Sequence, residues 1–153
     1  MITEIEQQTL DVDWFLTDGK HISLMASGGG QLPDSVAVSA ENNEKLRIYF
    51  RNLPEISDVI IDPELDNLLL KRLGSVADER YLSDYVSMTK KGLYSFDKSI
   101  SADFLDPGYH LVAKPVKPLT IYDLPQDISA ILMLTRYPHE INNVTQVDRR
   151  KIE

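Results

Sequence analysis

The chain has 153 residues, no cysteine, 42% hydrophobic residues and a formal net charge of −8 at pH 7. This length is typical of one domain, which buries a sizeable core without a covalent or metal staple. The absence of cysteine excludes disulfides, thiolate catalysis and cysteine-based zinc sites. The acidic balance argues against nucleic acid and anionic membranes as partners, because binding to phosphate relies on Lys and Arg.

The first predicted element is a β-hairpin. Residues 12–17 are β-prone, Asp18-Gly19 is a strong two-residue turn signal, and residues 21–25 alternate polar and apolar side chains. This alternation predicts a sheet with one buried face, toward which Ile22 and Leu24 point.

Helices are predicted next. Ser39 is a suitable N-cap, and an apolar stripe at helical spacing follows it and stops before Pro54. The stripe consists of Leu46, Tyr49, Phe50 and Leu53. Residues 59–61 are short, apolar and β-branched, which fits either a strand or the wall of a loop.

Two further helices are expected in the middle of the chain. Asp62 before Pro63 predicts an N-cap with proline at the first helical position, in a helix that ends at Gly74. The leucines that fit one face of this helix are Leu65, Leu68, Leu69 and Leu73. Asp78 predicts the cap of the next helix, which Gly92 terminates.

The C-terminal half reads mostly as strands. Residues 93–96 and 109–113 have strand patterns, and residues 115–122 are expected to continue at a sheet edge because prolines avoid central strands. Residues 125–137 fit a helix or a buried strand equally well, since periodicity cannot separate the two over so short a run.

These elements predict an α+β fold. The expected architecture is a single domain over residues 1–153, with an N-terminal β-hairpin, two or three helices and then a mostly antiparallel sheet. Both ends, near residues 1–10 and 142–153, are expected to fray. The acidic N-terminus lacks the basic and apolar regions of a signal peptide, and no apolar run approaches the ~20 residues that a bilayer requires. A cytoplasmic location without membrane contact is therefore expected.

A glycine triplet, Gly28, Gly29 and Gly30, lies between a predicted strand and a predicted helix, where a phosphate-binding loop would lie. A Walker loop needs Gly-Lys-Ser/Thr at the start of the helix, and a dinucleotide fingerprint needs a third glycine where Pro33 stands. The triplet is therefore expected to serve chain turning, and a ligand loop is the alternative.

Other catalytic and metal-binding patterns are weak. The histidines His21, His110 and His139 form no pair at helical spacing, although His21 and His110 could meet across a sheet. Residues 62–73 imitate the start of a calcium loop but lack its glycine and its final glutamate. No Gly-x-Ser-x-Gly nucleophile elbow is present. The sequence thus predicts no catalytic residue, no metal and no cofactor.

An acidic segment is the strongest binding signal. Between Leu53 and Leu70 the chain has five acids and no base. A solvated face with helix-cap acids would explain part of this pattern. The alternative is a patch that docks on a basic protein, and its expected residues are Asp58, Asp62, Glu64 and Asp66.

Several segments resemble a known class of proteins. The motifs are Asp13-Trp14-Phe15, Asp18-Gly19, Ser27–Gly30 with Leu32-Pro33, Lys91–Asp97, and Tyr109–Ala113 with the prolines after it. They resemble small bacterial proteins, some of which are similar to immunity proteins of contact-dependent or polymorphic toxin systems. The matching residues are turns, strand cores and a helix start. The resemblance implies a bacterial cytoplasmic protein whose function is binding.

The leading hypothesis is a non-enzymatic protein-binding module, of the type of an immunity inhibitor that caps a basic toxin. One alternative is a small enzyme or ligand-binding domain that uses the Gly28–Gly30 loop. Another is a subunit of a larger assembly, which leaves self-association open.

Overall fold

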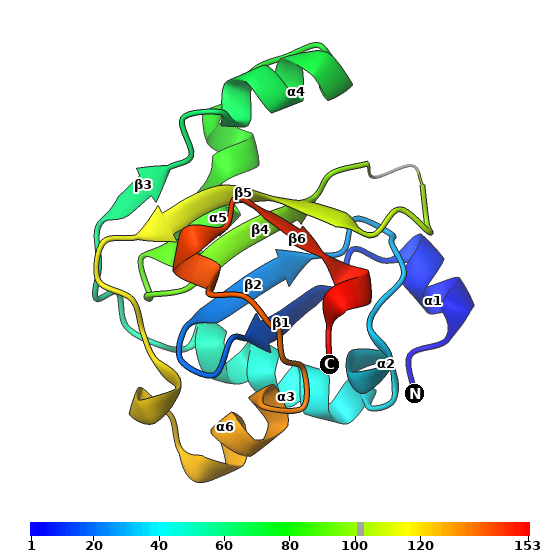
Figure 1. Ribbon diagram of the computed structural model, residues 1–153, viewed down its shortest axis with the longest axis vertical. Helices are drawn as coiled ribbons and strands as arrows, with labels where there is room; N and C mark the ends of the chain where they lie inside the picture. The colour runs from blue at the N-terminus through cyan, green and yellow to red at the C-terminus, as the bar shows by residue number, and fades with distance from the viewer. Residues whose placement is uncertain (101–102) are drawn as a thin grey trace.

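The computed structural model describes residues 1–100 and 103–153, which form one α+β domain around a mixed sheet (Figure 1). The strands within these residues are β1 (Asp13–Thr17), β2 (Ile22–Ala26), β3 (Val59–Ile61), β4 (Tyr94–Lys98), β5 (Gly108–Pro115) and β6 (Gln146–Asp148). The α-helices are α1 (Glu4–Thr9), α2 (Asp34–Ala37), α3 (Ala40–Arg51), α4 (Leu65–Leu73), α5 (Glu79–Thr89) and α6 (Gln126–Leu132). Short 3₁₀ turns occupy Ile121–Asp123 (η1), Ile141–Asn143 (η2) and Arg149–Lys151 (η3).

The strand order is β1-β2-β4-β5-β3, and β6 pairs with β5 as well. All pairs are antiparallel except β2 with β4, so the prediction of a mostly antiparallel sheet is confirmed. Because β4 occupies one edge of β5, β3 and β6 share the other edge. β3 pairs with residues 113–115 and β6 with residues 108–110. β3 is thus the last strand on this side of the sheet.

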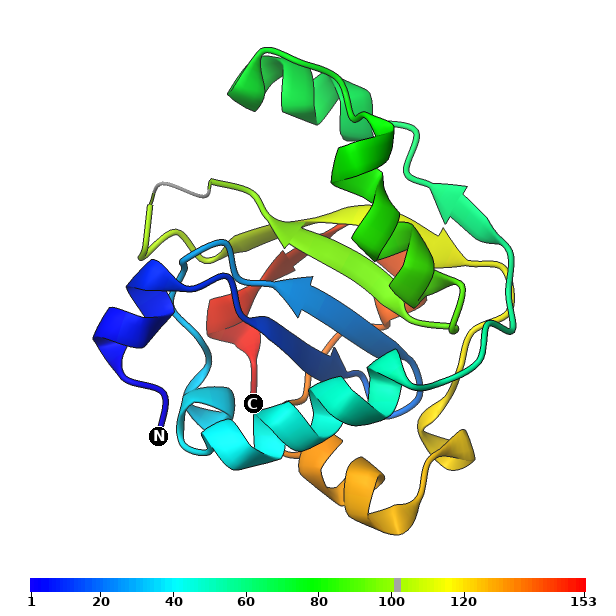
Figure 2. The same ribbon diagram turned by 180° about the vertical axis from the view of Figure 1, so that it is seen from behind.

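The N-terminal hairpin is confirmed, but it is buried on both faces rather than on one. Every residue of β2 is buried. Trp14 and Met25 belong to the cluster on one face, while Phe15 and Leu24 belong to the cluster on the other. The helices α3 and α5 lie over the second face (Figure 2), and β6 with the C-terminal turn lies over the first (Figure 1).

The caps of two helices match the sequence. Ser39 accepts a hydrogen bond from the Asn42 backbone N–H at 3.1 Å, and Asp78 accepts one from Tyr81 N–H at 2.8 Å. These side chains satisfy backbone donors that would otherwise lack a partner at the start of α3 and α5.

The cap predicted at Asp62 is wrong. α4 begins at Leu65, and its N-cap residue Glu64 makes no side-chain capping bond. Asp62 instead directly follows β3, and its N–H donates to the Val112 carbonyl at 3.0 Å. Pairing with β5 therefore holds Asp62 in extended structure and delays the helix. Gly74 ends α4 in the left-handed region, as predicted, with φ 73°. The side chain of Leu73 lies outside those that the structure describes.

Three expectations for the C-terminal half are resolved. The chain leaves the sheet after Pro115 and reaches η1 through one isolated bridge between Thr120 and His21, so residues 115–122 do not continue as an edge strand. Residues 126–132 are helical. The segment near residues 142–153 holds β6 and η3 rather than a frayed tail, because Val147 is buried in the core beside Tyr109.

The N-terminal segment is also ordered. Thr3 and Glu6 form a reciprocal capping box at the start of α1, and Ile2 joins the core. Within residues 1–100 and 103–153, no helix combines the length and apolar character needed to cross a membrane.

Candidate functional site

The four acids of the predicted patch follow one another along β3 and into α4. Asp58 directly precedes β3 and Asp62 directly follows it. Glu64 and Asp66 belong to the start of α4. Asp58, Glu64 and Asp66 are exposed and Asp62 is half-buried. We call residues 55–66 the acidic edge, because they contain these acids together with the outermost strand on this side.

The backbone of β3 has an unpaired outer side. Val116 N–H donates to the Asp58 carbonyl, and Asp62 N–H donates to the Val112 carbonyl, both at 3.0 Å. Residues 58, 60 and 62 thus face β5, and in an antiparallel ladder Val59 and Ile61 then direct their N–H and C=O groups away from it. In the part of the chain that the structure describes, β3 pairs with β5 alone.

Apolar side chains accompany this open edge. Ile56, Ile60 and Ile61 are 38%, 45% and 36% exposed. Their partners in β5 include Lys114, which lies opposite Ile60 and is itself exposed. The acidic edge therefore combines free backbone groups, exposed isoleucines and carboxylates, with one lysine beside them.

Two of the acids already have local roles. Burial raises the pKa of Asp62, and the charge of Glu64 raises it further, while the Glu64 N–H and Lys114 lower it. Asp66 accepts a hydrogen bond from Ala77 N–H at 3.0 Å and so ties the first turn of α4 to the loop before α5. Among the described residues, the Glu64 carboxylate accepts only one hydrogen bond, from the exposed side chain of Asn67 at 3.1 Å, so Asp58 and Glu64 are the more available members of the predicted patch.

A groove runs along α5 next to the acidic edge. Its volume is about 540 Å³, and its lining residues are Glu55, Ala77, Asp78, Glu79, Leu82, Ser83, Val86, Ser87 and Lys90. Leu82 and Val86 give it an apolar wall, and Glu55, Asp78 and Glu79 give it an acidic rim. Sequence reasoning missed this groove, because Glu55 reaches α5 only through the bonds from Ile56 and Ser57 N–H to the Lys90 carbonyl.

The glycine triplet is packed against neighbouring segments. Gly28 and Gly29 have positive φ, and a Cβ at Gly29 would lie 3.0 Å from the Gln8 carbonyl oxygen. A Cβ at Gly30 would overlap the buried side chain of Lys98. Close approach of backbone and side chain thus accounts for glycine at positions 29 and 30. A cavity of about 430 Å³ adjoins the loop at Gln31 and is lined by residues 31–35, 149, 150, 152 and 153.

The histidines occupy separate environments. His21 is half-buried and packs edge-on against Tyr94, His110 is buried in β5, and His139 is exposed beside Tyr137. In the register of the sheet, His110 lies opposite Asp97 and Gln146, not opposite His21. Among residues 1–100 and 103–153, no three His, Asp or Glu side chains gather in a way that could hold a metal ion.

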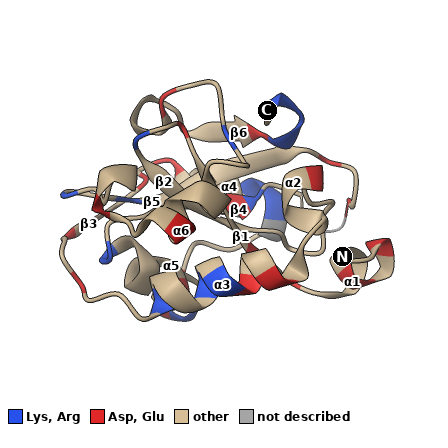
Figure 3. Cartoon of the chain, turned by 90° about the horizontal axis from the view of Figure 1, so that it is seen from below, with Lys and Arg blue, Asp and Glu red and all other residues tan. Residues whose placement is uncertain are grey.

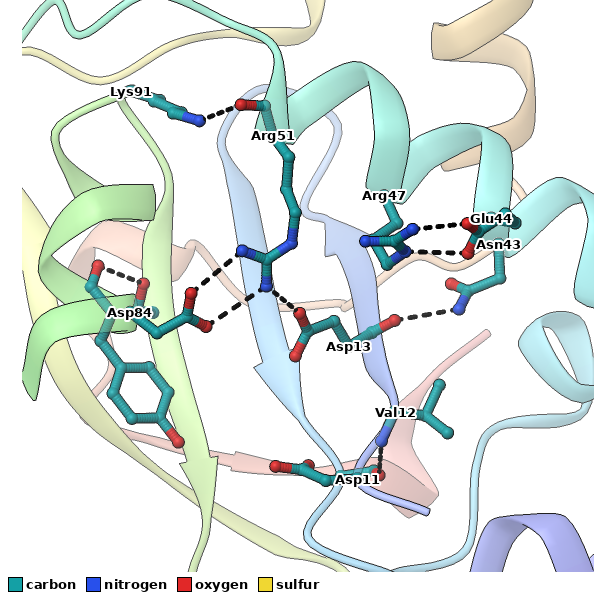
Figure 4. A network of polar contacts seen from close by, with 12 residues as sticks. Asp11, Val12, Asp13, Asn43, Glu44, Arg47, Arg51, Asp84 and Lys91 are labelled. Carbon is teal, nitrogen blue, oxygen red and sulfur yellow. Dashed lines mark hydrogen bonds and ion pairs between the residues drawn. The ribbon is translucent and has the colours of Figure 1, made fainter. Parts of the chain in front are cut away.

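A polar network that the sequence did not reveal joins three elements. Arg51 at the end of α3 contacts Asp13 of β1 at 2.5 Å and Asp84 of α5 at 3.0 Å (Figure 4). Lys91 donates to the Arg51 carbonyl. Burial raises the pKa of Asp13 although Arg51 acts in the opposite direction. These groups bond to one another across α3, β1 and α5, so the network stabilises the packing of these three elements.

A second polar pair that the sequence did not reveal lies under α5. Tyr81 donates its hydroxyl hydrogen bond to Asp97 at 2.7 Å. Burial raises the pKa of Asp97, and burial together with the Asp97 charge raises the pKa of Tyr81. The packing of α5 on β4 brings these two residues together, since 16 positions separate them in the sequence.

Comparison of this chain with protein-family models, with curated proteins and with solved structures finds no match in any of the three.

Proposed function

We propose that this chain is a non-enzymatic binding protein whose acidic edge recognises a basic partner protein. The observation that carries the proposal is the open side of β3, where exposed isoleucines lie between the carboxylates of Asp58 and Glu64. Free backbone groups, apolar side chains and mostly negative charge are together the elements of a strand-edge interface.

A basic toxin is the partner class that fits best, with this chain as its immunity-type inhibitor in the bacterial cytoplasm. The net charge of −8 favours fast association with a positively charged protein. A nuclease is one such target, since its cleft must be basic to hold phosphates. Three basic residues, Arg149, Arg150 and Lys151, gather at the C-terminal turn η3 (Figure 3), while Lys114 lies opposite Ile60 of the acidic edge.

The test is a comparison of two charge-matched variants in affinity capture from a bacterial lysate. Asp58→Asn/Glu64→Gln removes the two most available acids of the acidic edge. Glu4→Gln/Glu41→Gln removes two exposed acids from α1 and α3, so both variants change the net charge equally. We expect a basic protein that wild type retains at low salt and releases at raised salt.

The acidic-edge variant should retain this protein about tenfold less, which corresponds to about 1.4 kcal/mol. The control variant should retain it as wild type does. Equal retention by all three forms would show that neither the acidic edge nor net charge governs binding, and an equal loss in both variants would show that general charge governs it.

A further inference from the structure

The open side of β3 and the groove beside α5 adjoin each other. Val59 packs against the buried cluster around Leu65 and Val112, and so do Ala77 and Leu82, which also line the groove. Just before β3, the Ile56 and Ser57 N–H groups donate to the carbonyl of Lys90 at the end of α5, which also lines the groove. A strand added outside β3 would therefore lie about 4.8 Å from it and pass along the groove.

An added strand would meet complementary groups on two sides. The outward N–H and C=O groups of Val59 and Ile61 would complete a ladder with it. Alternate side chains of the added strand point to the α5 side, where Leu82 and Val86 offer an apolar wall. The rim acids Glu55, Asp78 and Glu79 then lie within reach of flanking positive charges.

The charges at the ends of β3 favour a basic segment over a second copy of this chain as the added strand. If two copies of this chain paired through β3 in antiparallel fashion, the acids at the ends of one strand would meet those of the other. Asp58 and Asp62 bracket β3, so this pairing would place like charges side by side, which is destabilising. A basic strand would instead place Lys or Arg there.

We infer that the partner contributes an extended segment, in which basic residues alternate with apolar ones, and that this segment adds to β3 and inserts an apolar side chain into the groove beside α5. The inference rests on the proposed function and specifies how the acidic edge binds. It makes Val59 and Ile61 the backbone contacts, and Val86 a contact for the inserted side chain.

The probe is a capped nine-residue peptide in which lysine alternates with valine and leucine. Hydrogen exchange of individual amides is followed by NMR with and without this peptide. We expect exchange at the Val59 and Ile61 N–H groups to slow at least tenfold at saturation. A peptide with glutamate in place of lysine, and one with a central proline, should not produce this protection.

Two variants test the contacts. Ile61→Pro removes an outward N–H but keeps the bonds to β5, because proline is tolerated on the free side of an edge strand. Val86→Arg fills the groove. Each should lower the affinity for the lysine peptide at least tenfold, while Ile48→Arg, at a 49% exposed isoleucine of α3, should leave it unchanged.

The outcomes separate the two proposals. No protection at Val59 and Ile61 with the lysine peptide, or unchanged affinity in Ile61→Pro and Val86→Arg, overturns the strand-addition mode. A dimer of the free protein that Ile61→Pro dissociates also overturns it, because a second copy would then occupy the edge. If the mode fails while Asp58→Asn/Glu64→Gln still weakens capture of a basic protein, the proposed function stands without it.

Discussion

At the scale of single residues, His110 shows what the sheet does to a titratable group. Its side chain is buried, and its Nδ1 lies 3.4 Å from the Ser99 hydroxyl. Within the described residues, Nε2 has no hydrogen-bond partner. Burial, followed by the nearby charge of Arg72, lowers the pKa of His110 to about 4. The neutral imidazole is therefore the form that the fold accommodates.

Stability should fall in acid because of this residue. In the unfolded chain His110 titrates near 6.5, so between about pH 6.5 and pH 4 the unfolded state binds the extra proton. The free energy of unfolding therefore keeps its full value, as far as His110 is concerned, above pH 6.5. It falls by about 3 kcal/mol in total as the pH drops through this interval. Urea unfolding at a series of pH values measures it.

The variant His110→Gln isolates the effect, because carboxyl groups titrate alike in both proteins. Its stability should depend less steeply on pH than that of wild type over this interval. His139→Gln, at an exposed position, should keep the wild-type slope. Parallel curves for wild type and His110→Gln would show that His110 keeps an ordinary pKa in the fold.

Helix-cap signals in the sequence were correct where the side chain bonds to a backbone N–H within its own turn. Ser39 and Asp78 cap helices because each bonds to an N–H three residues away, within its own turn. Asp62 has the same local pattern but caps no helix, since its N–H extends the ladder of β3 by bonding to Val112 of the distant strand β5. Among the acids, the sequence identified which residues are clustered, while the structure showed that Asp66 is engaged with Ala77.

At the scale of elements, Arg51 ties α3 to β1 and α5. The side chain of Asp13 is 17% exposed, and Arg51 is its cation partner. Removing a partner from a largely buried charge costs more than breaking a surface ion pair. The neighbouring Arg47 pairs with Glu44 on the exposed surface of the same helix.

Arg51→Met should lower the free energy of unfolding by about 2 kcal/mol, because it leaves Asp13 without its cation. Arg47→Met is the matched control, and should change it by less than about 0.5 kcal/mol. Denaturant unfolding of both variants at pH 7 provides the comparison. Similar small losses in the two variants would mean that the Asp13 contact contributes no more than a surface pair.

The elements themselves were partly predictable. The hairpin, α3 and α5 have strong periodicity and clear end signals, and all three form as expected. Residues 126–132 were ambiguous, and packing of Ile128 and Leu132 on the face with Phe50 selects the helix. The continuation at residues 115–122 was wrong, because the Gly92–Leu119 contact and η1 draw this segment away from the sheet edge.

At the scale of the whole molecule, the sheet is covered on both faces by different elements. The face with Trp14 and Phe96 lies under the N- and C-terminal segments. The face with Phe15 lies under the helices, whose side chains include Phe50 of α3. The two clusters share the same strands, because adjacent residues of one strand point to opposite faces. Loss of either cluster should therefore unfold both.

Phe50→Ala and Phe96→Ala should each cost about 3–5 kcal/mol while unfolding stays cooperative. Trp14 fluorescence reports the face opposite Phe50, and far-UV circular dichroism reports the helices. In Phe50→Ala both probes should report the same, lower unfolding midpoint. Ile48→Ala, at an exposed site of α3, should leave both midpoints unchanged. Separate midpoints in Phe50→Ala would indicate two independent units.

The sequence by itself determined the fold class, the hairpin and the caps of α3 and α5, because each depends on neighbours within a few positions. It also located the acids of the acidic edge. Only the tertiary structure decided the strand order, the burial of the hairpin on both faces, the ordered chain ends and the groove beside α5. These features depend on contacts between residues far apart in the chain, such as Trp14 with Tyr109, whose energies no local pattern encodes.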